Sequence, residues 1–252
     1  MDKIRLNKFL AHSGIASRRK VEDIILSKSV KVNGKIAILP QTLIDPKVDT
    51  VKVNDRVVKE EKKYYFILNK PKGFICSNQI NPNSSSKNSP KLHKNKKSST
   101  KKSKEHLVID LFKDYGVRLF TVGRLDKDTT GLLVVTNDGD FANKVIHPSS
   151  NLEKEYFVKV KENLLDIHLK KISKGTFVEK KFVKPKKVIK TTRKTMRIMV
   201  TEGKKREIKV FIQKANLTLF ELQRVRIGNL KLENIPFGYY KRVSLAEVSK
   251  IF

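Results

Sequence analysis

Residues 122–140 read Val122-Gly-Arg-Leu-Asp-Lys-Asp-Thr-Thr-Gly-Leu-Leu-Val-Val-Thr-Asn-Asp-Gly-Asp140, and this stretch decides the fold of the chain. Four consecutive apolar residues, 132–135, predict a buried strand. The sequence Asn137-Asp138-Gly139 predicts a turn directly after it. In the loop before the strand, Arg124 and Asp126 lie two positions apart. In an extended segment their side chains therefore point to the same side.

Arg124 and Asp126 allow two interpretations from the residues alone. A carboxylate on a loop beside a buried strand, with an arginine within reach, can be an ionised acid held in a polar cleft. The same two residues can form a structural ion pair that closes a turn. Because structural ion pairs outnumber active sites, this stretch alone favours the structural pair.

The composition restricts the class of protein. The 252 residues allow one large domain, or a small domain followed by a larger one. Only 38% of the residues are hydrophobic and 32% are charged, with a net charge of +31. Such an excess of cations opposes compaction unless a polyanion is nearby, so nucleic acid is the first partner to consider and a membrane surface is a weaker alternative. No apolar stretch approaches the roughly 18 residues of a membrane-spanning helix.

The residues that bind metals are few and scattered. Cys76 is the only cysteine, and the five histidines have no metal-ligand spacing. We therefore expect a metal-free chemistry and a reducing compartment. Met1-Asp2-Lys3 runs directly into patterned sequence without a secretory leader, which predicts a cytoplasmic protein.

Residues 1–48 form a compact basic unit in this prediction. Apolar residues at helical spacing predict a first helix that ends at Gly14, and Ser17 is a suitable N-cap for a second helix. Three cations, residues 18–20, occupy its first turn. The helix dipole disfavours cations there, so we interpret them as phosphate contacts. Asn33-Gly34 between two apolar runs predicts a hairpin with a type I′ turn.

This unit resembles the alpha-L RNA-binding motif of the ribosomal protein S-four type. The matching pattern is Arg5-Leu-Asn-Lys-Phe-Leu-Ala11, Gly14, Ser17-Arg-Arg19 and Val30-Lys-Val-Asn-Gly34. A generic basic helical hairpin is the alternative. The resemblance implies that two helices and a loop grip structured RNA, through Arg5, Lys8, Arg18, Arg19, Lys20, Lys31 and Asn33.

The remainder is predicted to be a linker, 49–62, and a second α+β domain, 63–252, with many strands. Within it, 69–73 is predicted as a turn, 106–117 as a helix and 206–213 as a helix that enters the core. The segment 81–105 is rich in Lys, Ser and Asn without apolar periodicity, so we expect it to be disordered. It is either a cationic arm that adds RNA affinity or a tolerated surface insertion.

Three separated pieces carry residues suited to a flipped nucleobase. They are Gly123–Asp126 with its acid, 154–156 with an aromatic ring, and 202–209 with several cations. A ring can stack on the extruded base, while a cation holds the carboxylate that does the chemistry. Their separation in the chain does not prove that they meet.

The second domain resembles the ribosomal RNA pseudouridine synthases of the RsuA/RluB type. The resemblance covers nearly the whole chain outside 81–105 and extends to the N-terminal domain. Its patches, in order along the chain, are Asn69-Lys-Pro-Lys-Gly73, Gly123-Arg-Leu-Asp126, Thr129 to Leu133, Thr136-Asn-Asp-Gly139, His147-Pro-Ser149 and Arg226-Ile-Gly228. It implies a mixed, mainly antiparallel sheet and the isomerisation of a uridine to pseudouridine without metal or cofactor.

The resemblance also implies a role for individual residues. Asp126 matches the catalytic aspartate, Tyr156 the active-site tyrosine, and Lys209 the cation that pairs with the aspartate. Arg124 matches an arginine that stabilises the flipped-out RNA. The sequence departs from the family after the Glu-Gly turn, where Glu207 replaces the usual Gln and Val210-Phe211 replaces Arg-Met. Whether the aspartate attacks the sugar or abstracts a proton from it is left open.

We therefore expect a monomeric enzyme that modifies ribosomal RNA, with His147-Pro148-Ser149 favouring the large subunit. Two alternatives are open: a catalytically silent RNA-binding or ribosome-assembly factor, and a synthase that acts on another RNA.

Overall fold

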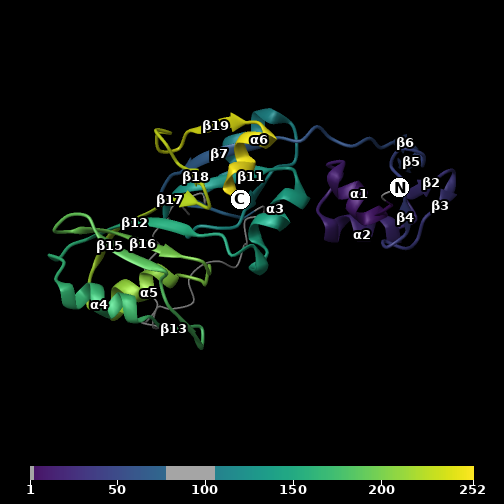
Figure 1. Cartoon of the computed structure of the whole chain (residues 1–252). Coiled ribbons are helices and arrows are strands. Elements are labelled where there is room, and N and C mark those ends of the chain that lie inside the picture. The colour runs from purple at the N-terminus through teal and green to yellow at the C-terminus, as the bar shows by residue number, and fades with distance from the viewer. Residues whose placement is uncertain (1–2, 78–105) are drawn as a thin grey trace, which may run out of the picture.

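The computed structural model describes residues 3–77 and 106–252 (Figure 1). The segment predicted to be disordered, 81–105, lies outside the described residues. Two packed units follow each other along the chain, a small N-terminal one and a larger one built on a single long sheet. None of the helices in the described ranges is long and apolar enough to cross a membrane.

The N-terminal unit contains the two predicted helices, α1 (Leu6–His12) and α2 (Arg18–Leu26). Ser17 caps α2, since its hydroxyl accepts a hydrogen bond from the backbone N–H of Lys20. Asn33 and Gly34 both have positive φ, as a type I′ turn requires. The strands are β1 (Ile4–Arg5) paired with β4 (Leu43–Ile44), and a sheet ordered β3 (Lys35–Ile36), β2 (Val30–Val32), β5 (Val51–Val53) and β6 (Arg56–Val57).

This unit continues beyond residue 48, where the sequence predicted a linker. Strand β5 pairs antiparallel with β2, and β6 pairs with β5. Val51 is buried, and Val53 and Val58 pack against the same core as α1 and α2. The sequence repeats here the pattern of the first hairpin, with Val51-Lys-Val53 before Asn54-Asp55, so a signal for a second hairpin was present. We propose that the connecting segment begins after Val58.

The second unit is α+β with a mixed, mainly antiparallel sheet, which confirms the predicted fold class. Its strand order is β15-β16-β12-β17-β11-β7-β19, with β10 on β11 and β18 on β17. The bounds are β7 Tyr65–Lys70, β10 Phe120–Val122, β11 Thr130–Thr136, β12 Lys154–Val160, β15 Lys187–Lys190, β16 Thr195–Val200, β17 Leu219–Ile227, β18 Leu230–Lys231 and β19 Tyr240–Val243. Two small pairs lie outside this sheet: β8 (Phe74–Ile75) with β9 (His106–Leu107), and β13 (Thr176–Val178) with β14 (Lys181–Val183).

Helices cover both faces of the sheet. On one face, α3 (Gly139–Ile146) and α6 (Leu245–Val248) pack on β7 and β11. On the other face, α4 (Asp166–Lys174) and α5 (Glu207–Lys214) cover β12 and β16, while the segment Val108–Tyr115 covers β7 and β11. Short 3₁₀ turns complete the unit at Pro148–Ser150 and Ser249–Ile251. Tyr156 contacts both apolar clusters of this second face, so it lies where the two halves meet.

Two predicted elements differ in the structure. Residues 106–117 form β9 and a 3₁₀ segment kinked at Phe112 rather than one helix, although Val108 and Phe112 are buried as expected. Asn69 and Lys70 belong to the buried strand β7 rather than to a turn. The sequence misleads here because polar side chains signal a surface, whereas their partners are distant backbone carbonyls.

Gly131 allows the only parallel strand contact of the long sheet among the described residues, that of β11 with β17. Its φ is +105°, and a Cβ added there would lie 2.2 Å from the carbonyl oxygen of Arg224. Backbone of β17 therefore occupies the space that a side chain would need. This close approach sets the distance between β17 and the loop that carries Asp126.

Gly131→Ala should cost more than about 3 kcal/mol of unfolding free energy, because the methyl group would push β17 away from β11. Gly116→Ala is the matched control. Gly116 also has positive φ, but nothing lies within 4 Å of its added Cβ, so only the backbone cost of about 1 kcal/mol applies. Urea unfolding measures both variants, and equal costs would contradict this account of the β11–β17 contact.

Candidate active site

The loop before β11 presents Asp126 to α5. Lys209, in the first turns of α5, forms an ion pair with Asp126, with 2.9 Å between Nζ and Oδ2. Both side chains retain partial exposure, 18% for Lys209 and 34% for Asp126. Arg124 is exposed, and no ion pair joins it to Asp126 in the part of the chain that the structure describes. The structural Arg124–Asp126 pair that this stretch alone favoured is therefore wrong, and the pairing with Lys209 is confirmed.

Tyr156 is held in the same region by the sheet. In strand register, Tyr156 of β12 lies opposite Arg224 of β17, and Arg224 lies opposite Gly131 of β11. The three residues form one row across the sheet, and Asp126 precedes the end of this row by five positions. Tyr156 is half-buried, which leaves part of its ring available.

Buried groups anchor the Asp126 loop from below. Lys70 has no exposed surface, and its ammonium group donates hydrogen bonds to the carbonyls of Pro71, Lys127 and Thr129 at 3.0, 3.2 and 3.0 Å. Burial lowers the pKa of Lys70 to about 8. The Leu125 N–H donates to the thiol sulfur of Cys76 at 3.4 Å. Burial raises the pKa of that thiol, so Cys76 is a neutral packing residue rather than a nucleophile.

The floor of the site contains further buried charges. Arg224 is 5% exposed; its Nε donates to the carbonyl of Leu132, while its Nη2 is buried with no hydrogen-bond partner. Lys154, which is half-buried, donates to the carbonyl of Thr201. Glu207, at the start of α5, is 4% exposed and accepts a hydrogen bond from the backbone N–H of Lys204. Burial raises the pKa of Glu207, and that hydrogen bond opposes the shift only in part.

On the other face of the sheet, Glu155 fixes β12 beside Tyr156. Its carboxylate accepts hydrogen bonds from Arg197 at 2.6 Å and from Arg226 at 2.7 Å. Burial alone would raise the pKa of Glu155, but these two hydrogen bonds outweigh it and lower the pKa. The clamp ties β12 to β16 and β17 at the position that orients Tyr156.

The predicted RNA contacts of the N-terminal unit divide into free and engaged side chains. Arg5 and residues 18–20 are exposed. Lys8 pairs with Asp140 at the start of α3, at 2.8 Å, and so joins the two units. Lys31 pairs with Asp55 at 2.8 Å. The Asn33 amide donates to Asp49 and accepts from the Thr50 N–H, which gives this residue a structural role in its turn.

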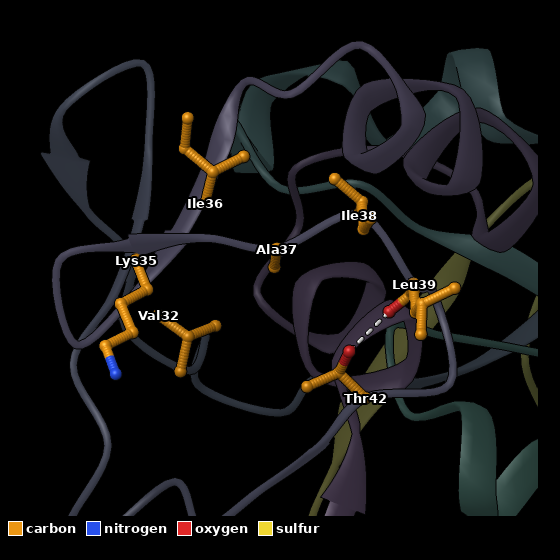
Figure 2. Close-up of a pocket in the computed structure, with 7 residues that line it drawn as sticks. All are labelled: Val32, Lys35, Ile36, Ala37, Ile38, Leu39 and Thr42. Carbon is orange, nitrogen blue, oxygen red and sulfur yellow. Dashed lines mark hydrogen bonds between the residues drawn. The ribbon is translucent and has the colours of Figure 1, made fainter.

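Two cavities are formed by other residues. One, of about 240 Å³, is an apolar hollow in the N-terminal unit, where the Thr42 hydroxyl donates to the Leu39 carbonyl (Figure 2). The other, of about 750 Å³, lies on the sheet face that carries Glu155, beside the segment 231–237. Neither is lined by Asp126, Tyr156 or Lys209. Among the described residues, no group of three or more His, Cys, Asp and Glu side chains is placed to hold a metal ion.

Sequence reasoning missed Lys70 and Arg224 as supports of this site. Lys70 lies two positions after the apolar run Tyr65–Leu68, and Arg224 lies two positions after Leu222 in an alternating strand pattern, where a buried cation is unexpected. A charged residue that continues a strand pattern was the available signal. It identifies a buried donor, but it does not identify the carbonyls that receive the bonds.

A carboxylate paired with a cation, on a loop next to the strand row that carries an aromatic ring, suits a class of enzyme that acts on a nucleobase extruded from RNA. The comparisons with known proteins agree with this class. The RNA pseudouridylate synthase family matches residues 64–215, and the S4 domain family matches residues 4–48. The chain belongs to the RNA pseudouridylate synthase family.

Relatives extend this similarity over nearly the whole chain. A chloroplastic protein of Arabidopsis thaliana, described as a putative ribosomal large subunit pseudouridine synthase, is 42% identical over 96% of this chain, which spans 58% of that protein's length. Ribosomal large subunit pseudouridine synthase B of Bacillus subtilis is 33% identical over 98% of this chain and 95% of its own. A solved structure described as a pseudouridylate synthase is 25% identical, with a TM-score of 0.64, over 99% of this chain and all of its own.

Lys70→Met should destabilise the protein by roughly 3 kcal/mol or more, because Met fills a similar volume but leaves three carbonyls without their donor. It should also reduce turnover, since two of the released carbonyls, those of Lys127 and Thr129, belong to the Asp126 loop. Lys72→Met is the control, because Lys72 is exposed on the same turn. Thermal unfolding and turnover check both variants; an unchanged melting temperature for Lys70→Met would contradict the anchoring role.

Glu207→Gln should stabilise the protein at pH 7.5. The raised pKa means that the folded state binds this proton more tightly than the unfolded state, so stability falls as the pH rises from about 4.3, the ordinary pKa, through the folded value. Gln carries no charge to bury and still accepts from the Lys204 N–H. The melting temperature should therefore rise at pH 7.5 and match the parent at pH 4. Glu60→Gln, at an exposed position away from α5, should change neither value; a loss of stability in Glu207→Gln at pH 7.5 would show that the carboxylate is paired.

Proposed function

We propose that this RNA pseudouridine synthase isomerises a uridine of ribosomal RNA, with Asp126 as its catalytic residue. The observation that carries the proposal is the ion pair of Asp126 with Lys209 at 2.9 Å, on a loop anchored by buried donors and beside the row that contains Tyr156. The relatives' descriptions as ribosomal large subunit pseudouridine synthases favour a uridine of the large subunit.

The chemistry asks three things of these side chains. Cleavage of the bond from N1 to C1′ places positive charge on the sugar, which the carboxylate of Asp126 stabilises or captures. The freed uracil must stay in the site and turn, and stacking on the Tyr156 ring retains it. C5 then bonds to C1′, its proton is lost, and N1 gains a proton. Atoms and charge balance without a cofactor.

The cations around this site have separate roles in the proposal. Lys209 holds the Asp126 carboxylate in place before RNA arrives. Arg124 is exposed next to the site and supports the RNA from which the uridine has been extruded. Arg5, Arg18, Arg19 and Lys20 hold phosphates of structured RNA, and Lys8, Lys31 and Asn33 support the surface that presents them. We propose that the enzyme acts as a monomer, in the cytoplasm.

A dual-specificity RNA pseudouridine synthase of Escherichia coli is 30% identical over 99% of this chain and 78% of its own length. Its description as dual-specific supports a second candidate substrate, a uridine in another RNA. Position-resolved mapping of pseudouridine in total RNA, with and without this protein, separates the two candidates.

Asp126→Ala should lower isomerisation by roughly a thousandfold or more, because the group that meets the sugar is removed, while RNA binding persists. Release of tritium from C5-labelled uridine in ribosomal RNA measures the first, and a gel shift measures the second. Asp128→Asn is the control, since Asp128 is an exposed carboxylate on the same loop. Full activity of Asp126→Ala would refute the assignment, as would equal losses in the two variants.

A further inference from the structure

The β13–β14 hairpin exposes a pair of phenylalanines. Phe177 and Phe182 are direct cross-strand partners and are 68% and 55% exposed. Their rings meet edge to face, with centroids 5.5 Å apart. An antiparallel hairpin normally turns its apolar side chains inward and its polar ones to water. This hairpin is apolar on both faces, and its outer face needs an explanation.

The inner face already supplies the packing that holds the hairpin in place. Val178 and Val183 are 3% and 2% exposed and belong to the apolar cluster that includes Phe211 and Ile212 of α5. Phe177 and Phe182 are not part of that cluster. An aromatic cross-strand pair contributes only about 0.5–1.5 kcal/mol, while most of both rings stays in water. Stability alone therefore accounts poorly for two exposed rings.

The rings are supported by local packing. The Phe182 ring lies close to Gly175, where an added Cβ would come within 3.0 Å of its Cζ. The turn residues Glu179 and Lys180 both have positive φ, the conformation that a tight two-residue hairpin needs. Two rings that already pack edge to face present open ring surface on which a flat group can stack.

The surroundings of the rings are strongly cationic. Residues 170–187 contain eight lysines and one glutamate. Lys186 pairs with Glu153, and no ion pair joins the other seven lysines to an acidic side chain within the described ranges. Ring faces that are open beside unpaired cations match a ligand with flat apolar groups on an anionic chain. Unpaired nucleotides of RNA have this chemistry, since bases stack on aromatic rings while lysines neutralise phosphates.

The hairpin is also connected to the candidate active site. Strand β13 packs against α5, the helix that carries Lys209. In Figure 1 the hairpin projects from the catalytic unit below α4 and α5, so both of its outer rings are accessible to a long ligand.

We propose that Phe177 and Phe182 form a stacking platform for unpaired nucleotides of the RNA substrate, outside the site where the uridine reacts. The proposal rests on the proposed function for the identity of the RNA, but it concerns a separate surface. Stacking supplies affinity for single strands, and the seven lysines supply attraction that does not depend on sequence.

The experiment uses the full chain and two probes of equal length, an unstructured uridine-rich RNA and a perfect RNA duplex. Phe177→Ala/Phe182→Ala should weaken binding of the single strand at least about fivefold, the lower end of the loss of one stacked base, and leave duplex binding unchanged. Because stacking is not ionic, the dependence of binding on salt should keep its slope. Phe177→Tyr/Phe182→Tyr, which keeps both aromatic rings, should bind the single strand as the parent protein does.

Phe220→Ala is the matched control. Phe220 is 62% exposed, but Lys159 already lies over its ring, 5.0 Å from the centroid. Its loss should leave binding of the single strand unchanged. Circular dichroism and thermal unfolding establish that each variant folds.

A second measurement uses the absence of tryptophan from the chain. In Phe182→Trp the single indole should be quenched by the single-stranded probe and not by the duplex, whereas in Phe220→Trp neither probe should quench. Quenching by anionic vesicles without quenching by RNA would overturn the proposal in favour of a membrane surface. Equal losses on both probes, or none, would overturn it as well.

Tritium release by the same variants distinguishes the two hypotheses. Isomerisation that depends on Asp126, together with unchanged binding by Phe177→Ala/Phe182→Ala, refutes the platform and leaves the proposed function intact. Selective loss of single-strand binding without any isomerisation by the parent chain supports the platform and refutes the proposed function.

Discussion

The close approach of β17 to β11 at Gly131 is the constraint on which the rest of the catalytic unit depends. Without a side chain at Gly131, the backbone of Arg224 fills that space, and Tyr156 follows as the next member of the row. The row fixes how far the Asp126 loop lies from the half of the sheet that α5 covers. Since Lys209 is on α5, its pairing with Asp126 is a consequence of this spacing.

Buried cations act as hydrogen-bond donors throughout this region. Lys70 and Arg224 are buried and Lys154 is half-buried, and each donates to backbone carbonyls, so positive charge that is costly to bury also completes the hydrogen bonding of loops and strand ends. The same charges lie beneath the surface that we propose receives RNA. The exposed cations of this face can attract a polyanion, and Lys70 holds the carbonyls of the Asp126 loop.

The sequence predicted local elements well and long-range partners poorly. The run Leu132 to Val135 is a local pattern and is a strand in the structure, whereas the predicted turn at 137–139 is a bend in which Asp138 caps α3, a helix that begins at Gly139. The environment of Lys70 could not be predicted, because its acceptors lie up to 59 positions away and carbonyls have no sequence signal. Strand β5 was missed although Val51-Lys-Val53 repeats the Val-Lys-Val pattern of β2, the strand with which it pairs.

For the candidate site, the spacing of residues and the resemblance to a known family led to different predictions. The spacing of Arg124 and Asp126 suggested a pair that the structure does not contain, because the two side chains lie on a loop and not on an extended strand. The pairing of Asp126 with Lys209, 83 positions away, came from the resemblance alone. Phe177 and Phe182 carried a signal of their own, two aromatic residues each followed by valine across a charged turn, but exposure of their rings depends on which face α5 covers.

The cost of flipping a base connects the two surfaces that this chain offers to RNA. Extruding a uridine from a duplex costs a few kcal/mol, because the base loses its stacking and its pairing. In an unpaired region the free-energy cost is lower, since no base pair has to be broken. Phosphate contacts cannot tell these regions apart, because charge attracts paired and unpaired RNA alike. Exposed aromatic rings can distinguish them, since only an unpaired base has a ring face available for stacking. An enzyme with a net charge of +31 attracts any RNA strongly and without regard to its structure. A stacking platform formed by Phe177 and Phe182 would direct it to unpaired RNA, where base flipping costs the least free energy.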